Sequence, residues 1–255
     1  MSTSLLTKKI EEAKSQGRKA LIPFLPGGFP DRDRFWQELE ALDAAGADII
    51  EIGVPFSDPV ADGPVVENAS LDCLRDGVCL SWILFELEKR KEKLSAGIVL
   101  MGYYNPFLQY GLKNFARDAA KAGVSGVIVP DLPLDEAREF KDALAAHGLD
   151  LVFLVGLNTS GERLDKYAAV ASGFIYFVSV LGTTGVRETL PEEIAAKLAD
   201  ARKHFNVPMA LGFGIKTPEQ LTAFGDSIDA VVFGSALIKY IRDGGDATGF
   251  MAGWR

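Results

Sequence analysis

Short apolar segments alternate with amphipathic helical segments along the whole chain. The apolar segments are rich in Val, Ile, Leu and Phe, which is typical of strands that are covered on both faces of a parallel sheet. They are Ala20–Phe24, Asp48–Gly53, Gly97–Met101, Gly126–Val129, Leu151–Val155, Phe174–Val178, Met209–Gly212 and Ala230–Phe233. Eight strands, each followed by a helix, favour a closed (β/α)8 barrel.

The intervening segments have the period of helices with one charged face. They cover Arg32–Ala45, Ser70–Glu92, Leu112–Ala122, Leu134–His147, Glu162–Ala171, Pro191–Phe205, Pro218–Phe224 and Ser235–Arg242. The first residues, MSTSLLTKKIEEAKSQG, predict an extra amphipathic helix before the first strand. No linker divides the sequence, so we expect an α/β fold, a single TIM barrel over residues 1–255. The alternative is an open doubly wound sheet, which usually has a G-x-G-x-x-G turn where this chain has LPGGFP.

Composition narrows the class of protein. The chain has 255 residues, of which 48% are hydrophobic, and this is enough for one large core. Its net charge of −8 argues against binding to nucleic acid or to an anionic membrane surface. The longest apolar runs are too short to span a bilayer, and the N-terminus has no apolar signal core. Cys73 and Cys79 lack metal-ligand spacing, so we expect them to pack in a reduced, cytoplasmic protein.

Glu51 is the most unusual residue, because it interrupts the apolar run Asp48–Gly53. Side chains alternate along a strand, so Glu51 shares a face with Ile49 and Gly53. Burial of an unpaired carboxylate is costly and raises its pKa, as a general acid working near pH 7 requires. The alternative is a structural Glu that is paired with a buried cation or a backbone group.

Asp62 lies in the loop after the same strand. In a barrel, both acids therefore belong to the end where the C-termini of the strands meet, which carries the catalytic residues in this fold. Asp62-Gly63-Pro64 also fits a plain turn. The pairing with Glu51 on one βα unit favours catalysis.

Glycine-rich segments follow the last three strands. VSVLGTTGVR at 178–187 is either a lid that excludes water or a flexible surface loop. Gly214 and the pair Gly234-Ser235 each precede a helix, and the loops after strands 7 and 8 form the usual phosphate site of this fold. Together with Gly185 they predict phosphate binding, with ordinary tight turns as the alternative.

The remaining candidates are aromatic. Phe24, Tyr103, Tyr176 and Phe213 stand at strand ends, where they are either core residues or the walls of a site for a flat apolar ligand. The two histidines stand at predicted helix C-termini, away from these loops, and the predicted strands contain no lysine. We therefore expect no His-ligated metal, no His base and no Schiff base.

These motifs resemble the tryptophan synthase α subunit family over nearly the whole chain. The most specific match is EIGVPFSDPVADGP at 51–64. Further matches follow in the same order: PF at 23–24, YYNP at 103–106, PDLP at 130–133, YFVS at 176–179, GTTG at 182–185, GFGI at 212–215 and GSA at 234–236.

The resemblance implies retro-aldol cleavage of indole-3-glycerol phosphate to indole and glyceraldehyde 3-phosphate, without a metal or cofactor. It implies that Glu51 performs the proton transfers and that Asp62 binds the ring N–H. Substrate contacts would come from the aromatic candidates and from a loop threonine, Thr184. Phosphate would bind Gly185, Gly214, Gly234 and Ser235.

The family also binds a β subunit that carries pyridoxal phosphate, in an αββα heterotetramer. The resemblance places Phe56, Asp58, Pro59 and Pro133 on that interface. The chain departs from the family pattern at Pro26, Glu67, Asn158 and Thr183, where Thr, Gln, Thr and Val are common. Two other functions stay open from the residues themselves: another phosphosugar isomerase or lyase, and a non-catalytic subunit that senses phosphate ligands.

Overall fold

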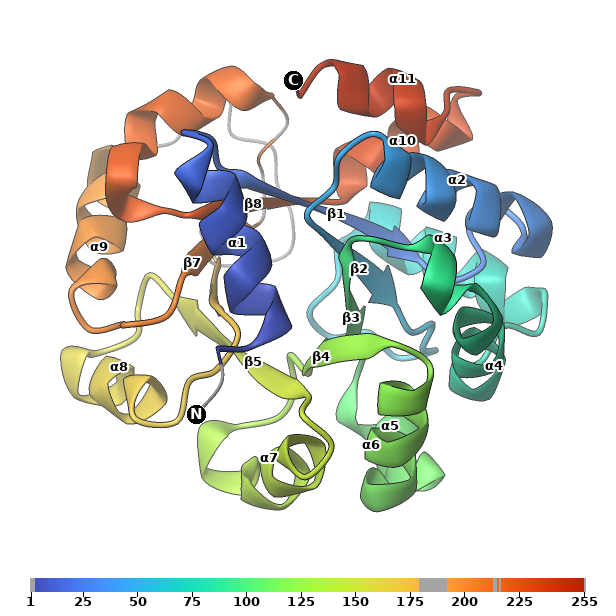
Figure 1. Cartoon of the computed structure of the whole chain (residues 1–255), viewed down its shortest axis with the longest axis horizontal. Coiled ribbons are helices and arrows are strands. Elements are labelled where there is room, and N and C mark those ends of the chain that lie inside the picture. Colours follow the sequence, from blue (N-terminus) through green and yellow to red (C-terminus); the bar gives the residue numbers. More distant parts are fainter. Residues whose placement is uncertain (1–2, 179–191, 213–214, 216, 255) are drawn as a thin grey trace.

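The computed structural model describes residues 3–178, 192–212, 215 and 217–254. Within this part of the chain, parallel strands pair in sequence order and the last strand pairs with the first, which closes the barrel (Figure 1). The strands are β1 (Ala20–Pro26), β2 (Ile49–Gly53), β3 (Gly97–Met101), β4 (Val124–Ile128), β5 (Asp150–Gly156), β6 (Ile175–Val178), β7 (Met209–Gly212) and β8 (Ala230–Phe233). The predicted (β/α)8 fold is confirmed.

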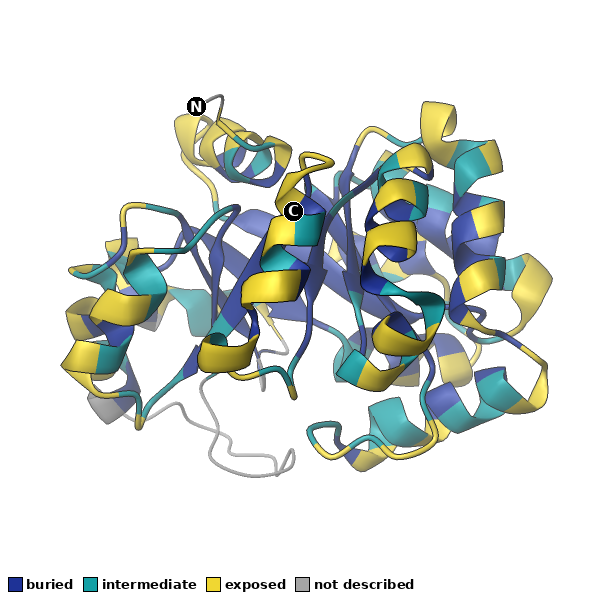
Figure 2. Ribbon diagram, turned by 90° about the horizontal axis from the view of Figure 1, so that it is seen from below, coloured by how far each residue is buried: buried dark blue, intermediate teal, exposed yellow. Residues whose placement is uncertain are grey.

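Helices surround the strands, and their outer faces are exposed while the strands are buried (Figure 2). The α-helices are α1 (Leu5–Ser15), α2 (Arg32–Ala44), α3 (Pro64–Arg75), α4 (Leu80–Arg90), α5 (Tyr104–Tyr110), α6 (Leu112–Lys121), α7 (Arg138–Ala145), α8 (Gly161–Ala168), α9 (Glu192–Arg202), α10 (Ser235–Arg242) and α11 (Ala247–Ala252). Short 3-10 helices are η1 (Lys91–Lys93), η2 (Leu134–Glu136) and η3 (Pro218–Ser227). No helix in the described part of the chain is long and apolar enough to cross a membrane.

The helix predicted over Ser70–Glu92 is wrong, because α3 and α4 are separate helices. Gly77 has φ +74°, a left-handed conformation that ends α3, and Cys79 is the N-cap of α4. Cys79 is consequently exposed, so its predicted packing role is also wrong, whereas Cys73 is buried as expected. A second predicted helix, Leu134–His147, is divided into η2 and α7.

The predicted N-terminal helix α1 closes one end of the barrel (Figure 1). Its buried face, with Leu6 and Ile10, joins the cluster of side chains that fills the barrel interior. Leu6 packs against Gly97 and Gly126, near the starts of β3 and β4. A Cβ on Gly97 would lie 3.1 Å from the Leu6 side chain, and a Cβ on Gly126 would lie 2.7 Å from it. Thr7 Oγ1 donates a 2.7 Å hydrogen bond to the carbonyl of Gly173, just before β6. Because α1 occupies the end where the strands begin, the opposite end carries the loops of the candidate site.

Candidate active site

Glu51 lies in β2 and is only 1% exposed. Its neighbour on the same face, Ile49, belongs to the cluster inside the barrel, so Glu51 points into the interior. Within the described part of the chain, neither carboxyl oxygen has a hydrogen-bond partner. Burial, reinforced by the nearby charge of Asp62, raises the pKa of Glu51 to about 8.

Other buried acids show what a structural carboxylate looks like in this protein. Asp229 is 3% exposed and accepts a 2.8 Å bond from Lys14 Nζ. Glu38 is 4% exposed and accepts a 2.9 Å bond from Arg34 Nε. Glu51 is equally buried, but no cation among the described residues pairs with it, which argues against the interpretation that it is an ion-paired structural residue.

Asp62 lies in the loop between β2 and α3 and is half-buried. Burial is the largest cause of a pKa of about 6. The Tyr103 hydroxyl, which donates to the carboxylate, opposes the increase, and the charge of Glu67 adds to it. The N-cap of α3 is Gly63, so Asp62 is not explained as the capping residue of that helix. The site therefore holds two acids with unequal pKa values, the arrangement that separates an acid from a base near pH 7.

Two aromatic rings lie on the barrel interior near these acids. Phe24 is the register partner of Glu51, and its ring occupies the space beside Gly53 and Gly234, where a Cβ would come within 2.8 and 2.7 Å of it. Tyr176, in β6, is 5% exposed. Burial and the charges of the two acids raise the pKa of Tyr176 well above its usual value.

The packing role of Gly53 could not be predicted, because the sequence shows the glycine but not that the Phe24 ring lies over it.

The turn between β8 and α10 has the form expected of an anion site. Gly234 is the N-cap of α10 and Ser235 is its first residue; both are half-buried. The first turn of this helix contains no acid, so no side-chain charge there opposes an anion at the positive end of the helix dipole. The other predicted loop residues lie outside the described residues: Thr184, Gly185, Phe213 and Gly214.

The predicted interface residues lie on the loops around the site. Phe56 is half-buried and stacks on Tyr103, with ring centroids 5.3 Å apart. Asp58 and Pro133 are exposed, and Pro59 is half-buried. Val60, which the sequence did not single out, is 77% exposed on the same loop.

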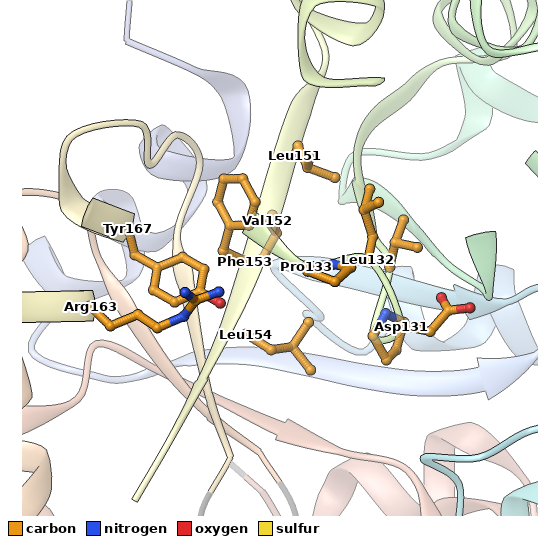
Figure 3. A pocket seen from close by; sticks show the side chains of 11 residues that line it. Asp131, Leu132, Pro133, Leu151, Val152, Phe153, Leu154, Arg163 and Tyr167 are labelled. Carbon is orange, nitrogen blue, oxygen red and sulfur yellow. The ribbon is translucent and has the colours of Figure 1, made fainter. Parts of the chain in front are cut away.

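A cavity of about 300 Å³ lies between the segment after β4, the first part of β5 and helix α8 (Figure 3). Its lining comprises Val129–Pro133, Leu151–Leu154, Arg163 and Tyr167. It contains neither Glu51 nor Asp62. In the residues that the structure describes, no three His, Cys, Asp or Glu side chains come together as metal ligands.

Comparison with known proteins agrees with the fold and the geometry. The family model described as tryptophan synthase alpha chain matches residues 10–250. Tryptophan synthase alpha chains of Solidesulfovibrio magneticus and Nitratidesulfovibrio vulgaris are 69% and 60% identical, covering 100% of this chain and 100% and 99% of their own lengths.

Solved structures match as well. Tryptophan synthase of Mycobacterium tuberculosis aligns with a TM-score of 0.88 and 34% identity, covering 99% of this chain and 98% of that one. The alpha subunit from Legionella pneumophila aligns with a TM-score of 0.87 and 32% identity, covering 98% and 95%. The chain belongs to the tryptophan synthase alpha chain family.

Proposed function

We propose that Glu51 and Asp62 are the catalytic residues with which this chain cleaves indole-3-glycerol phosphate to indole and glyceraldehyde 3-phosphate. Its family membership makes the chain a lyase with the α-subunit role in tryptophan biosynthesis. The observation that carries the residue assignment is the burial of Glu51 without a partner, beside an acid of lower pKa.

The unequal pKa values match the two tasks of the reaction. Near pH 7, Glu51 is mostly protonated and Asp62 is mostly ionised. Glu51 donates its proton to ring carbon 3, which removes the aromaticity of the pyrrole ring and places positive charge on the ring nitrogen. The Asp62 carboxylate accepts a hydrogen bond from the ring N–H and stabilises that charge.

Bond cleavage then restores Glu51. The Glu51 carboxylate takes the proton of the side-chain hydroxyl next to the ring. The electrons of that O–H bond form the aldehyde, and those of the breaking carbon–carbon bond return to the ring, which leaves as indole. Gly234 and Ser235 hold the phosphate group at the first turn of α10, and Phe24 and Tyr176 contact the ring. Thr184, Gly185, Phe213 and Gly214 complete this proposal from the sequence.

Indole release from indole-3-glycerol phosphate tests the proposal. Glu51→Gln keeps the size of the side chain but removes its ionisation, so we expect kcat to fall by several orders of magnitude while glyceraldehyde 3-phosphate still binds. Glu162→Gln is the matched control, since Glu162 is exposed on α8. Full turnover by Glu51→Gln would instead favour the non-catalytic phosphate sensor. If the wild type releases no indole but converts another phosphosugar, the chain is instead another phosphosugar isomerase or lyase.

The proposal includes a β subunit carrying pyridoxal phosphate, in an αββα heterotetramer in the cytoplasm. The predicted interface residues support it, because Phe56, Asp58, Pro59 and Pro133 belong to the loops after β2 and β4, at the site end of the barrel, and Asp58 and Pro133 are exposed. Sedimentation of the chain with and without a β subunit measures the assembly. An Asp58→Arg variant is expected to weaken it at least tenfold, and unchanged assembly would contradict this surface.

A further inference from the structure

We propose that Tyr103 is a positioning residue that holds the loop acid Asp62 in its catalytic place, and that Asp131 anchors the segment carrying Tyr103. The inference rests on the proposed function, in which Asp62 stabilises the charged ring. It gives Tyr103 a task other than the substrate contact predicted from the sequence.

The hydroxyl of Tyr103 joins the end of β3 to the loop after β2. Tyr103 is 4% exposed, and its Oη accepts a 2.9 Å hydrogen bond from the backbone N–H of Ala61. A tyrosine hydroxyl has one hydrogen to donate, and that hydrogen is directed to the Asp62 carboxylate. One oxygen therefore contacts two consecutive residues of the loop, Ala61 and Asp62.

Packing prevents the ring from moving away. Phe56, earlier in the same loop, stacks on Tyr103 at an interplanar angle of 29°. The neighbouring Gly102 allows the base of the loop to approach, since a Cβ there would lie 2.9 Å from Val54 Cβ. The Val54 N–H also donates a 2.7 Å bond to the carbonyl of Met101. The loop thus contacts the end of β3 at both of its ends.

Asp131 fixes the other side of this segment. Its Oδ1 accepts a 2.9 Å hydrogen bond from the backbone N–H of Tyr104, the residue that begins α5. Asp131 itself lies in the loop after β4, beside Pro133 of the proposed interface. The contacts Asp131–Tyr104 and Tyr103–Asp62 therefore form a continuous path between two loops that are distant in sequence.

The hydroxyl is a donor over the whole working pH range. Burial, with the negative charge of Asp62, raises the pKa of Tyr103 well above its usual value, so the phenol stays protonated. A neutral donor stabilises the ionised form of its acceptor and lowers the pKa of Asp62. Among the described residues, the charged and titratable groups that act on this pair are Glu51, Glu67, Tyr176 and Asp131. The negative charges of Glu51, Glu67 and Asp131 oppose a second charge nearby. The hydrogen bond from Tyr103 has the opposite effect and favours the ionised form of Asp62.

Tyr103→Phe keeps the ring and removes the hydroxyl. We expect the acidic limb of the kcat profile, which reports Asp62, to move up by about one pH unit. Because the pKa of Asp62 is about 6, kcat is expected to fall about twofold at pH 7 and nearly tenfold at pH 5. KM is expected to change less than twofold, because Tyr103 acts on Asp62 and not on the substrate. Carboxyl carbon NMR of Asp62 measures the same pKa increase without any dependence on turnover.

Tyr110→Phe is the matched control. The Tyr110 hydroxyl donates a 2.9 Å bond to Asp118, a tyrosine–aspartate pair on α5 and α6 with no contact to either catalytic acid. This variant is expected to keep the wild-type profile. At the anchor, the side chain of Asp131→Asn can still accept the hydrogen bond from the Tyr104 N–H, so this variant is expected to retain at least half of wild-type kcat. Asp131→Ala is expected to move the acidic limb of the kcat profile to higher pH.

Three outcomes would overturn the inference. An unchanged limb in folded Tyr103→Phe means that the hydroxyl does not hold Asp62. A raised KM with unchanged kcat makes Tyr103 a substrate contact. If Tyr103→Phe does not fold, an unchanged limb in Asp131→Ala decides against the anchor and the path. Because wild-type turnover and its loss in Glu51→Gln are measured separately, failure here leaves the assignment of Glu51 intact.

Discussion

The ring of Tyr176 lies directly against the backbone of Gly212 on the neighbouring strand. A Cβ added to Gly212 would come within 2.2 Å of the ring and 2.3 Å of its hydroxyl oxygen. Both residues face the barrel interior, in which Tyr176 lies close enough to Glu51 and Asp62 for their charges to raise its pKa. Gly212 is therefore required for its lack of a side chain, and the position of the ring depends on it.

Gly212→Ala should displace the Tyr176 ring toward the acids. We expect kcat/KM for indole release to fall at least tenfold, with a loss of about 1–3 kcal/mol in the free energy of unfolding, which is typical of overpacking. Gly161→Ala is the control, because its nearest neighbour would be His204 at an ordinary 3.6 Å. Wild-type kinetics in Gly212→Ala would show that the ring position does not matter.

Glu51→Gln should alter stability in a pH-dependent way. The pKa of Glu51 is about 8 in the folded chain and about 4.5 when exposed, so the unfolded chain releases this proton first as pH rises. As pH rises from 4.5 to 8, the free energy of unfolding of the wild type therefore decreases relative to that of a variant that cannot ionise at this position. We expect the difference in unfolding free energy to change by roughly 5 kcal/mol in favour of Glu51→Gln over this range, measured by urea denaturation.

Glu38→Gln provides the opposite case. Glu38 is also buried, but it is paired with Arg34 and accepts a 2.6 Å bond from the Ala247 N–H. Removal of its charge leaves the Arg34 contact without an anion, so we expect destabilisation of about 1–3 kcal/mol at pH 7. A pH-independent difference for Glu51→Gln, or stabilisation by Glu38→Gln, would contradict the contrast between the two acids.

Glu67→Gln should move the acidic limb of the activity profile to lower pH. Glu67 stands where Gln is common in the family, and its negative charge contributes to the raised pKa of Asp62. We expect a wild-type profile that rises near pH 6 and falls near pH 8, reporting Asp62 and Glu51. Loss of the Glu67 charge lowers the pKa of Asp62, and with it the acidic limb, by about half a pH unit. The limb near pH 8, which reports Glu51, is expected to stay where it is. A shift to higher pH would refute this role.

Gly234→Ala should weaken phosphate binding. A Cβ on Gly234 would lie 2.7 Å from Phe24 Cδ1, so the ring and the start of α10 cannot both keep their places. We expect KM for indole-3-glycerol phosphate to rise about tenfold, and the affinity for glyceraldehyde 3-phosphate, measured by calorimetry, to fall in parallel. Gly253→Ala, whose nearest contact would be 3.5 Å away, is expected to change neither.

The strand pattern was predictable because it depends on local chemistry. Runs such as Leu151–Val155 are apolar on both faces, which only a strand covered on both sides explains, and β5 contains this run. The division between α3 and α4 was harder to see. Gly77 costs only about 1 kcal/mol inside a helix, so a helical pattern tolerates it in principle. The helix ends there because Gly77 adopts φ +74°, and Val78, the next residue, lies against Gly28, which is far away in the sequence.

The sequence alone determined the order of the strands and their alternation with helical segments, the presence of two acids on one βα unit, and the glycine at the start of α10. These properties follow from hydrophobic period, turn chemistry and residue type, which are local. Only the tertiary structure decided that Glu51 faces the barrel interior without a partner, and that Tyr103 and Ala61 meet. Desolvation and pairing depend on what the rest of the chain places around a carboxyl group, and a linear pattern does not contain that information.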